Sequence, residues 1–166
     1  ELSEKGVEFI PNMPTEEIFC LPHKFGVNGT LASTKPLVYG GNIINDFVLK
    51  FEKGRIVDFS AKEGEETLRH LIETDEGSHY LGEIALVPYS SPISDTNTVF
   101  YNTLYDENAS CHFAIGSAYS SCIEGGNDIA EEDFDKYGIN DSLTHVDFMV
   151  GSADLDIVGI THDGEE

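Results

Sequence analysis

The chain has 166 residues, about the length of one domain, and 40% of them are hydrophobic, which is enough to form a folded core. With 31 acidic residues against 9 lysines and arginines, the formal net charge is −22, which disfavours binding to nucleic acid and to anionic membranes because like charges repel. No apolar run approaches the ~20 residues of a membrane span, and three cysteines without a C-x-x-C pair argue against a disulfide framework and predict a cytoplasmic location.

Strand-like segments dominate the chain. They are rich in valine, isoleucine and phenylalanine and are bounded by glycine, proline, asparagine or serine. In chain order they cover residues 29–35, 47–51, 56–59, 82–87, 112–116, 144–150 and 154–160. The second and third of these segments flank Glu52-Lys53-Gly54-Arg55, a turn sequence that predicts a hairpin.

Two helices are predicted between these strands. Residues 62–74 place their leucines and isoleucine on one face and glutamates outside, and residues 129–137 form a shorter helical pattern that ends at Gly138. Residues 89–110 are polar and rich in turn formers, so we expect a long loop across the surface. Many strands with two helical insertions predict a single, strand-rich α+β domain.

One carboxylate interrupts an otherwise apolar strand. In residues 81–88, Glu83 shares a strand face with Ala85 and Val87 if side chains alternate. A buried carboxylate must be protonated, pair with a cationic group or bind a cation, because burying it alone costs several kcal/mol. The alternative is an edge strand with Glu83 in solvent.

Histidines occur in two further apolar segments. His145 and Asp147 are two residues apart, so a strand projects both to one face, an arrangement typical of metal ligands. A structural ion pair is the alternative for this short motif. His112 opens the apolar segment 112–116, and Tyr119 follows seven residues later.

Paired glutamates follow two prolines near the N-terminus. Glu16 and Glu17 point to opposite sides of an extended segment, so only one of them enters a given site, unless both lie in a solvated turn. Together the segments offer carboxylate and imidazole groups that suit Zn²⁺, Co²⁺ or Mn²⁺. The five candidate ligands are Glu17, Glu83, His112, His145 and Asp147. Five ligands exceed the need of one open catalytic zinc, which predicts two ions that share a bridging carboxylate.

Four ordered blocks of the chain carry a resemblance to a known family. The blocks are Asn12-Met13-Pro14-Thr15-Glu16-Glu17, Gly82-Glu83-Ile84-Ala85-Leu86-Val87-Pro88, Asn108-Ala109-Ser110-Cys111-His112-Phe113-Ala114-Ile115-Gly116 and Ser142-Leu143-Thr144-His145-Val146-Asp147-Phe148-Met149-Val150-Gly151-Ser152. Between Gly6 and Thr161 the chain resembles the aminopeptidase T / aminopeptidase S / PepS family of dinuclear metallo-aminopeptidases.

The resemblance implies a cytosolic exopeptidase that acts on peptides with a free N-terminus and forms a homodimer. It places two divalent ions on the five candidate ligands, with Tyr119 as a further ligand or close neighbour. Family members have an additional N-terminal domain and a short C-terminal tail. We therefore expect residues 1–166 to be the metal-binding catalytic domain of a longer enzyme and to be catalytically incomplete alone.

The implied mechanism uses a hydroxide, activated by the two ions, that attacks the first peptide carbonyl. The second ion or a nearby carboxylate would hold the free α-amine of the substrate. Glu16 is the candidate general base, since it neighbours a candidate ligand without being needed as one. Tyr119 is a candidate donor to the tetrahedral intermediate.

Two other classes of function compete with this hypothesis. One is a cysteine hydrolase that uses Cys111 or Cys122 with His145 and Asp147, which would leave the glutamates without a role. The other is a non-catalytic acidic metal-binding module. The chain has no D-x-[DN]-x-[DN]-G loop, which argues against an EF-hand.

Overall fold

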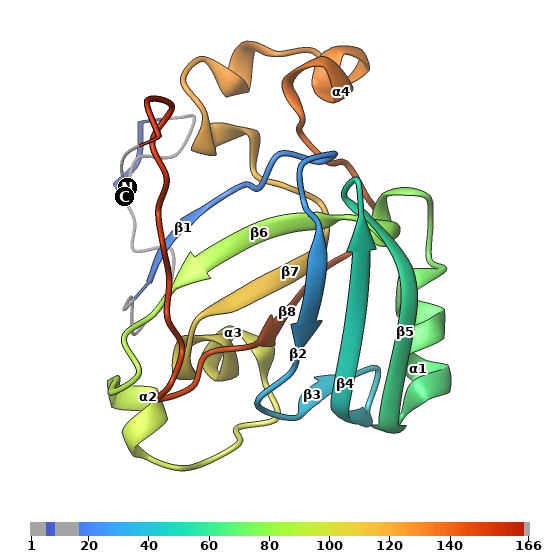
Figure 1. Cartoon of the computed structure of the whole chain (residues 1–166), viewed down its shortest axis with the longest axis vertical. Coiled ribbons are helices and arrows are strands. Elements are labelled where there is room, and N and C mark those ends of the chain that lie inside the picture. The colour runs from blue at the N-terminus through green and yellow to red at the C-terminus, as the bar shows by residue number, and fades with distance from the viewer. Residues whose placement is uncertain (1–5, 9–16, 165–166) are drawn as a thin grey trace.

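The computed structural model describes residues 6–8 and 17–164, whose strands form two sheets (Figure 1). The first sheet is antiparallel and has the order β1-β6-β7-β8. In the second sheet β2, β3 and β5 all pair with the long strand β4. The strands are β1 (Ile18–Cys20), β2 (Gly29–Ala32), β3 (Leu37–Tyr39), β4 (Asn42–Glu52), β5 (Arg55–Glu63), β6 (Leu81–Leu86), β7 (His112–Gly116) and β8 (His145–Met149).

The helices are short, and only α1 (Glu65–Ile72) exceeds four residues among those described. Its first turn carries two glutamates and its last turn an arginine and a histidine, which suits the helix dipole at both ends. The others are α2 (Pro92–Asp95), α3 (Thr103–Asp106), α4 (Phe134–Tyr137) and the 3₁₀ turns η1 (Gly77–His79), η2 (Glu107–Ala109), η3 (Ser120–Cys122), η4 (Gly126–Asp128) and η5 (Glu131–Asp133). No helix in the described part of the chain has the length and apolar character needed to cross a bilayer.

The hydrophobic core lies between the two sheets and beneath α1. Its centre includes Phe47 of β4 and Phe148 of β8, whose ring centroids are 5.4 Å apart. The buried apolar side chains of this cluster are Leu37, Ile44, Phe47, Leu49, Phe51, Ile56, Leu68, Leu71, Ile72, Leu81, Ile115, Val146 and Phe148. One face of the first sheet is therefore committed to the core.

The predicted α+β class and the predicted hairpin are confirmed. Strands β4 and β5 are joined at Lys53 and Gly54, both with positive φ, as a type I′ hairpin turn requires. A side chain at Gly54 is sterically excluded, because its Cβ would lie 1.7 Å from the backbone oxygen of Lys24. The strands predicted at 82–87, 112–116 and 144–150 agree with β6, β7 and β8 to within one residue at each end.

Three sequence predictions are wrong: the strand at residues 154–160, the helix at residues 129–137 and the surface loop at residues 89–110. Residues 154–160 form no strand, and their apolar side chains Leu155, Ile157 and Val158 are exposed. The segment leaves the end of β8 and turns back along the molecule without strand pairing in the described structure (Figure 1). Strand composition without a neighbouring strand edge is insufficient to form a strand.

The predicted helix 129–137 is reduced to η5 and α4, because its few apolar side chains are not buried against the core. The predicted surface loop 89–110 contains α2, α3 and η2 and has several buried residues. Strand β3 was not predicted from the sequence; its three residues pair with the start of β4.

Candidate metal centre

The face of the first sheet opposite the core carries the ionisable side chains. Residues paired across antiparallel strands project to the same face. Glu83 of β6 and Asp147 of β8 both align with the same residue of β7, and His112 and His145 lie at the starts of β7 and β8 on that face. Phe148, next to Asp147, projects to the other face and enters the core. Alternation along β8 thus separates a stabilising apolar face from a polar one.

A bulge in β6 aims Glu83 at this polar face. The register shifts between Leu81 and Glu83, so the two side chains point to opposite faces although they are two residues apart. Leu81 joins the core, whereas Glu83 lies among the histidines. Gly82 permits the bulge, because a Cβ there would lie 2.1 Å from the backbone oxygen of Ser117.

Glu17 reaches the same face from the residue before β1. Phe19 of β1 aligns with Ala85 of β6, which aligns with His112 of β7. Two residues earlier, Glu17 projects to the same side. Its Oε2 lies 3.2 Å from Nε2 of His112.

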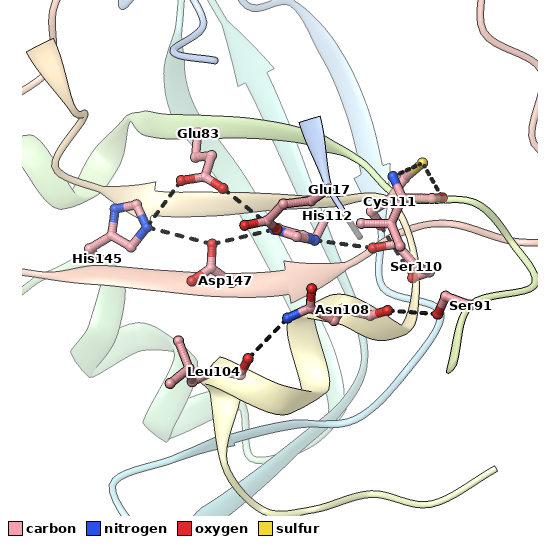
Figure 2. Close-up of polar contacts among 11 residues, drawn as sticks. Glu17, Glu83, Ser91, Leu104, Asn108, Ser110, Cys111, His112, His145 and Asp147 are labelled. Atoms are coloured by element: carbon pink, nitrogen blue, oxygen red, sulfur yellow. Dashed lines mark hydrogen bonds and ion pairs between the residues drawn. The ribbon is translucent and has the colours of Figure 1, made fainter. Parts of the chain in front are cut away.

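The acidic and imidazole groups form two sets that share Glu83 (Figure 2). In the first set, Nε2 of His112 lies 3.2 Å from Glu17 Oε2 and 3.4 Å from Glu83 Oε1. In the second, Nε2 of His145 lies 3.5 Å from Glu83 Oε2 and 3.6 Å from Asp147 Oδ1. The two oxygens of Glu83 thus face different imidazoles, as a bridging carboxylate would.

The other nitrogen of each imidazole is held by a backbone carbonyl. Nδ1 of His112 lies 3.1 Å from the oxygen of Ser110, and Nδ1 of His145 lies 2.6 Å from the oxygen of Ser117. A carbonyl only accepts, so Nδ1 carries the donated proton in each ring. In a neutral ring this leaves the Nε2 lone pair facing the carboxylates, the arrangement found in metal-ligating histidines.

Three buried atoms at the centre lack a hydrogen-bond partner, namely Glu17 Oε2, His112 Nε2 and Asp147 Oδ1. Leaving such an atom unsatisfied costs about 1–3 kcal/mol, and more for a charged group. Neighbouring ligands of a tetrahedral zinc, with bonds of about 2.0–2.2 Å, lie about 3.3–3.6 Å apart. The imidazole–carboxylate contacts within the two sets span 3.2–3.6 Å, and the ligand atoms of each set all lie within 4.8 Å of one another. Each set therefore has donors and spacing suited to one divalent ion.

Without such ions, protons hold the centre together. Burial would lower the pKa of His112 and His145, but the carboxylates beside them outweigh burial and raise these pKa values to about 10 and about 11. Burial would raise the pKa of Glu83, but the two imidazoles that face its oxygens lower it to about 2. Each imidazole therefore binds a proton tightly in the metal-free chain. A metal cation bound at Nε2 would replace that proton and its positive charge.

Glu107 is a functional candidate that the sequence reasoning missed. It is buried in η2, and burial together with the charge of Asp147 raises its pKa to about 9. It precedes His112 by five residues, within the segment predicted to be a surface loop. The signal was its position directly before the block Asn108–Gly116, whose strand begins at a histidine.

The remaining predicted residues differ in their placement. The ring of Tyr119 is 53% exposed, and its centroid lies 5.1 Å from that of His145, beside the centre. Glu16 lies outside the described residues. The thiol of Cys111 donates to the oxygen of Val87 and accepts from its N–H, at 3.3 and 3.4 Å, so it is engaged with the backbone. Cys122 lies in η3.

Comparison with known proteins agrees with this centre. Residues 1–166 match the family described as Thermophilic metalloprotease (M29). The chain is 63% identical to Aminopeptidase AmpS of Bacillus subtilis (strain 168) and 59% identical to Aminopeptidase 2 of Geobacillus stearothermophilus, over 99% and 98% of its length. It spans only 40% of each relative.

A solved structure shows the same fold. The structure titled Wild-type AmpT from Thermus thermophilus superimposes with a TM-score of 0.90 at 45% identity, over 99% of this chain and 40% of that one. The family inferred from four sequence blocks is thereby confirmed. The chain belongs to the M29 family of metalloproteases.

Proposed function

We propose that residues 1–166 form the metal-bearing part of a longer aminopeptidase, which hydrolyses the first peptide bond of peptides with a free N-terminus. The single observation that carries the proposal is the position of Glu83 between two imidazoles, in a centre with three unsatisfied buried atoms. The relatives at about 60% identity bear the name aminopeptidase, which supports this activity over a non-catalytic module.

We propose that the centre binds two divalent ions, one in each of the two ligand sets. Glu17 and His112 belong to the first, His145 and Asp147 to the second, and Glu83 to both. Carboxylate and imidazole donors suit Zn²⁺, Co²⁺ or Mn²⁺. When bound, such ions lower the pKa of water toward neutrality and polarise a peptide carbonyl.

The protein's own groups set the geometry of the reaction. The carbonyls of Ser110 and Ser117 fix the orientation of both imidazoles, which keeps Nε2 aimed at the centre. The surplus of carboxylates attracts the positively charged α-amine of a peptide. Tyr119, exposed beside His145, is our candidate for donating a hydrogen bond to the developing oxyanion, and Glu16 stays our candidate for the general base.

Two further parts of the proposal concern the longer protein. The family resemblance supports a homodimer in the cytoplasm. It also supports an N-terminal domain that completes the substrate cleft, so the 166 residues alone should cleave amino-acid amides more slowly than the longer protein. Equal rates for the two proteins would refute this incompleteness.

The test is hydrolysis of amino-acid amides by the longer enzyme, with and without chelator. Chelator should abolish activity, and added Zn²⁺, Co²⁺ or Mn²⁺ should restore it. Glu83→Gln should reduce kcat/KM as strongly as chelator does, because it removes the one carboxylate that both sets share. Glu73→Gln, at the exposed end of α1, is the matched control and should retain full activity. Activity that persists in chelator and in Glu83→Gln would refute a metal-dependent mechanism.

A further inference from the structure

Phe19 is an aromatic residue on the face of the metal centre. It aligns with Ala85, and Ala85 aligns with His112, so the three side chains form one row across β1, β6 and β7. The phenylalanines at the centre of the core, such as Phe148, are buried completely, whereas Phe19 is 38% exposed. An exposed aromatic side chain in line with a candidate ligand is available to contact a bound molecule.

A second aromatic side chain extends this surface. The rings of Phe19 and Tyr119 meet edge to face, with centroids 6.2 Å apart and an interplanar angle of 66°. Tyr119 in turn lies against His145, at 5.1 Å between centroids. The two rings therefore form an apolar wall that runs from the Glu17–His112 set to the His145–Asp147 set.

The chemistry of an N-terminal peptide bond determines what this wall meets. The carbon atom that carries the first side chain is bonded to both the α-amine and the reacting carbonyl. If these two groups bind at the carboxylates and ions of the centre, the first side chain must lie within a few bond lengths of them. The neighbouring groups Glu17, Glu83 and Asp147 are acidic, so the wall is the apolar contact offered beside them.

We propose that Phe19, packed against Tyr119, forms the wall of the subsite for the substrate's N-terminal side chain and favours large apolar residues there. This inference rests on the proposed aminopeptidase function and assigns its specificity. Phe19 is a specificity residue that touches substrate, with no part in binding the ions.

The test compares kcat/KM for leucine, phenylalanine and glycine amides in the longer enzyme and in Phe19→Ala. Phe19→Ala should lower kcat/KM for the leucine and phenylalanine amides by about 10-fold. This is the lower end of the roughly 10–200-fold effect of losing an apolar contact with substrate. Glycine amide has no side chain that could contact Phe19, so its kcat/KM should change by less than about twofold. Phe19→Leu keeps an apolar contact and should retain most of the preference for leucine amide.

A matched control is Phe25→Ala. Phe25 is 41% exposed and also makes an edge-to-face contact, but with Tyr80 rather than with a ring beside the centre. Its removal should leave the leucine-to-glycine ratio unchanged, and all three variants should bind as much metal as the parent.

The outcomes separate the wall from the proposed function. An active parent whose Phe19→Ala variant loses activity equally on all three amides, or on none, would overturn the role of Phe19 and leave the aminopeptidase function intact. A parent that hydrolyses none of the amides would overturn the proposed function, and the wall with it.

Discussion

The two faces of β8 differ in what they contribute to the molecule. Val146 and Phe148 enter the core, where they remove apolar surface from water and stabilise the fold. His145 and Asp147 project to the other face, where carboxylates are crowded and Oδ1 of Asp147 is buried without a hydrogen bond, 3.6 Å from Nε2 of His145. A single strand therefore both stabilises the domain through its apolar face and presents ionisable groups that are costly to bury on its other face. That cost is offset by protons on the two imidazoles in the metal-free chain, or by bound cations that replace those protons.

The largest expected effect is on the core face. Phe148→Ala should lower the free energy of unfolding of the metal-free chain by about 3–5 kcal/mol, because a large ring is removed from a fully buried site. Urea denaturation measures this change. Phe25→Ala, with an exposed ring, should change the stability by less than about 1 kcal/mol. A small loss in Phe148→Ala would mean that the packing of Phe148 against Phe47 contributes little.

A pH dependence should distinguish the metal-free polar face from the metal-loaded one. The pKa values of His112 and His145, about 10 and about 11, lie above the unfolded value of about 6.5. The metal-free fold therefore holds protons that the unfolded chain releases. Their stabilisation is complete below about pH 6.5 and is lost as the pH rises through the folded pKa values.

The free energy of unfolding of the chelator-treated chain should accordingly fall between about pH 7 and about pH 10. With ions bound, the imidazoles carry no proton at Nε2, so stability should instead rise between about pH 5 and about pH 7. Urea titrations at several pH values measure both slopes. Identical slopes with and without metal would contradict the assignment of the two histidines as ligands.

A smaller effect is expected at the edge of the polar face. Glu107→Gln removes a carboxyl group beside Asp147 and should weaken binding of one ion by about 10-fold, at the low end of the 10–100-fold range for groups that support ligands. Titration of the metal-free chain with Zn²⁺ measures the affinity of each site. Asp95→Asn is a control from the same segment, outside the centre, and should leave both affinities unchanged.

The sequence predicted β7 and β8 well because strand alternation is a local property. The spacing of His145 and Asp147 alone places both on one face, and the structure has them there. The same reasoning placed Glu83 with Ala85, and both do lie on the polar face. Patterns of this kind depend only on the pleat of the strand.

Other features depend on contacts that no local pattern contains. The bulge at Gly82 separates Leu81 from Glu83, and it requires close approach of the backbone near Ser117. The burial of Glu107 depends on how η2 packs against the end of β8. Residues 154–160 have a strand-like composition but form no strand, because they pair with no neighbouring strand among the described residues.

The most direct test of a shared bridging carboxylate is the number of ions bound per chain, measured by elemental analysis of the parent, Asp147→Asn and Glu83→Gln. The parent should bind two ions, and Asp147→Asn should retain the one held by Glu17 and His112. Glu83→Gln should lose both, because its two oxygens face both sets. A parent that binds one ion or none, or a Glu83→Gln variant that retains as much metal as Asp147→Asn, would contradict the dinuclear centre.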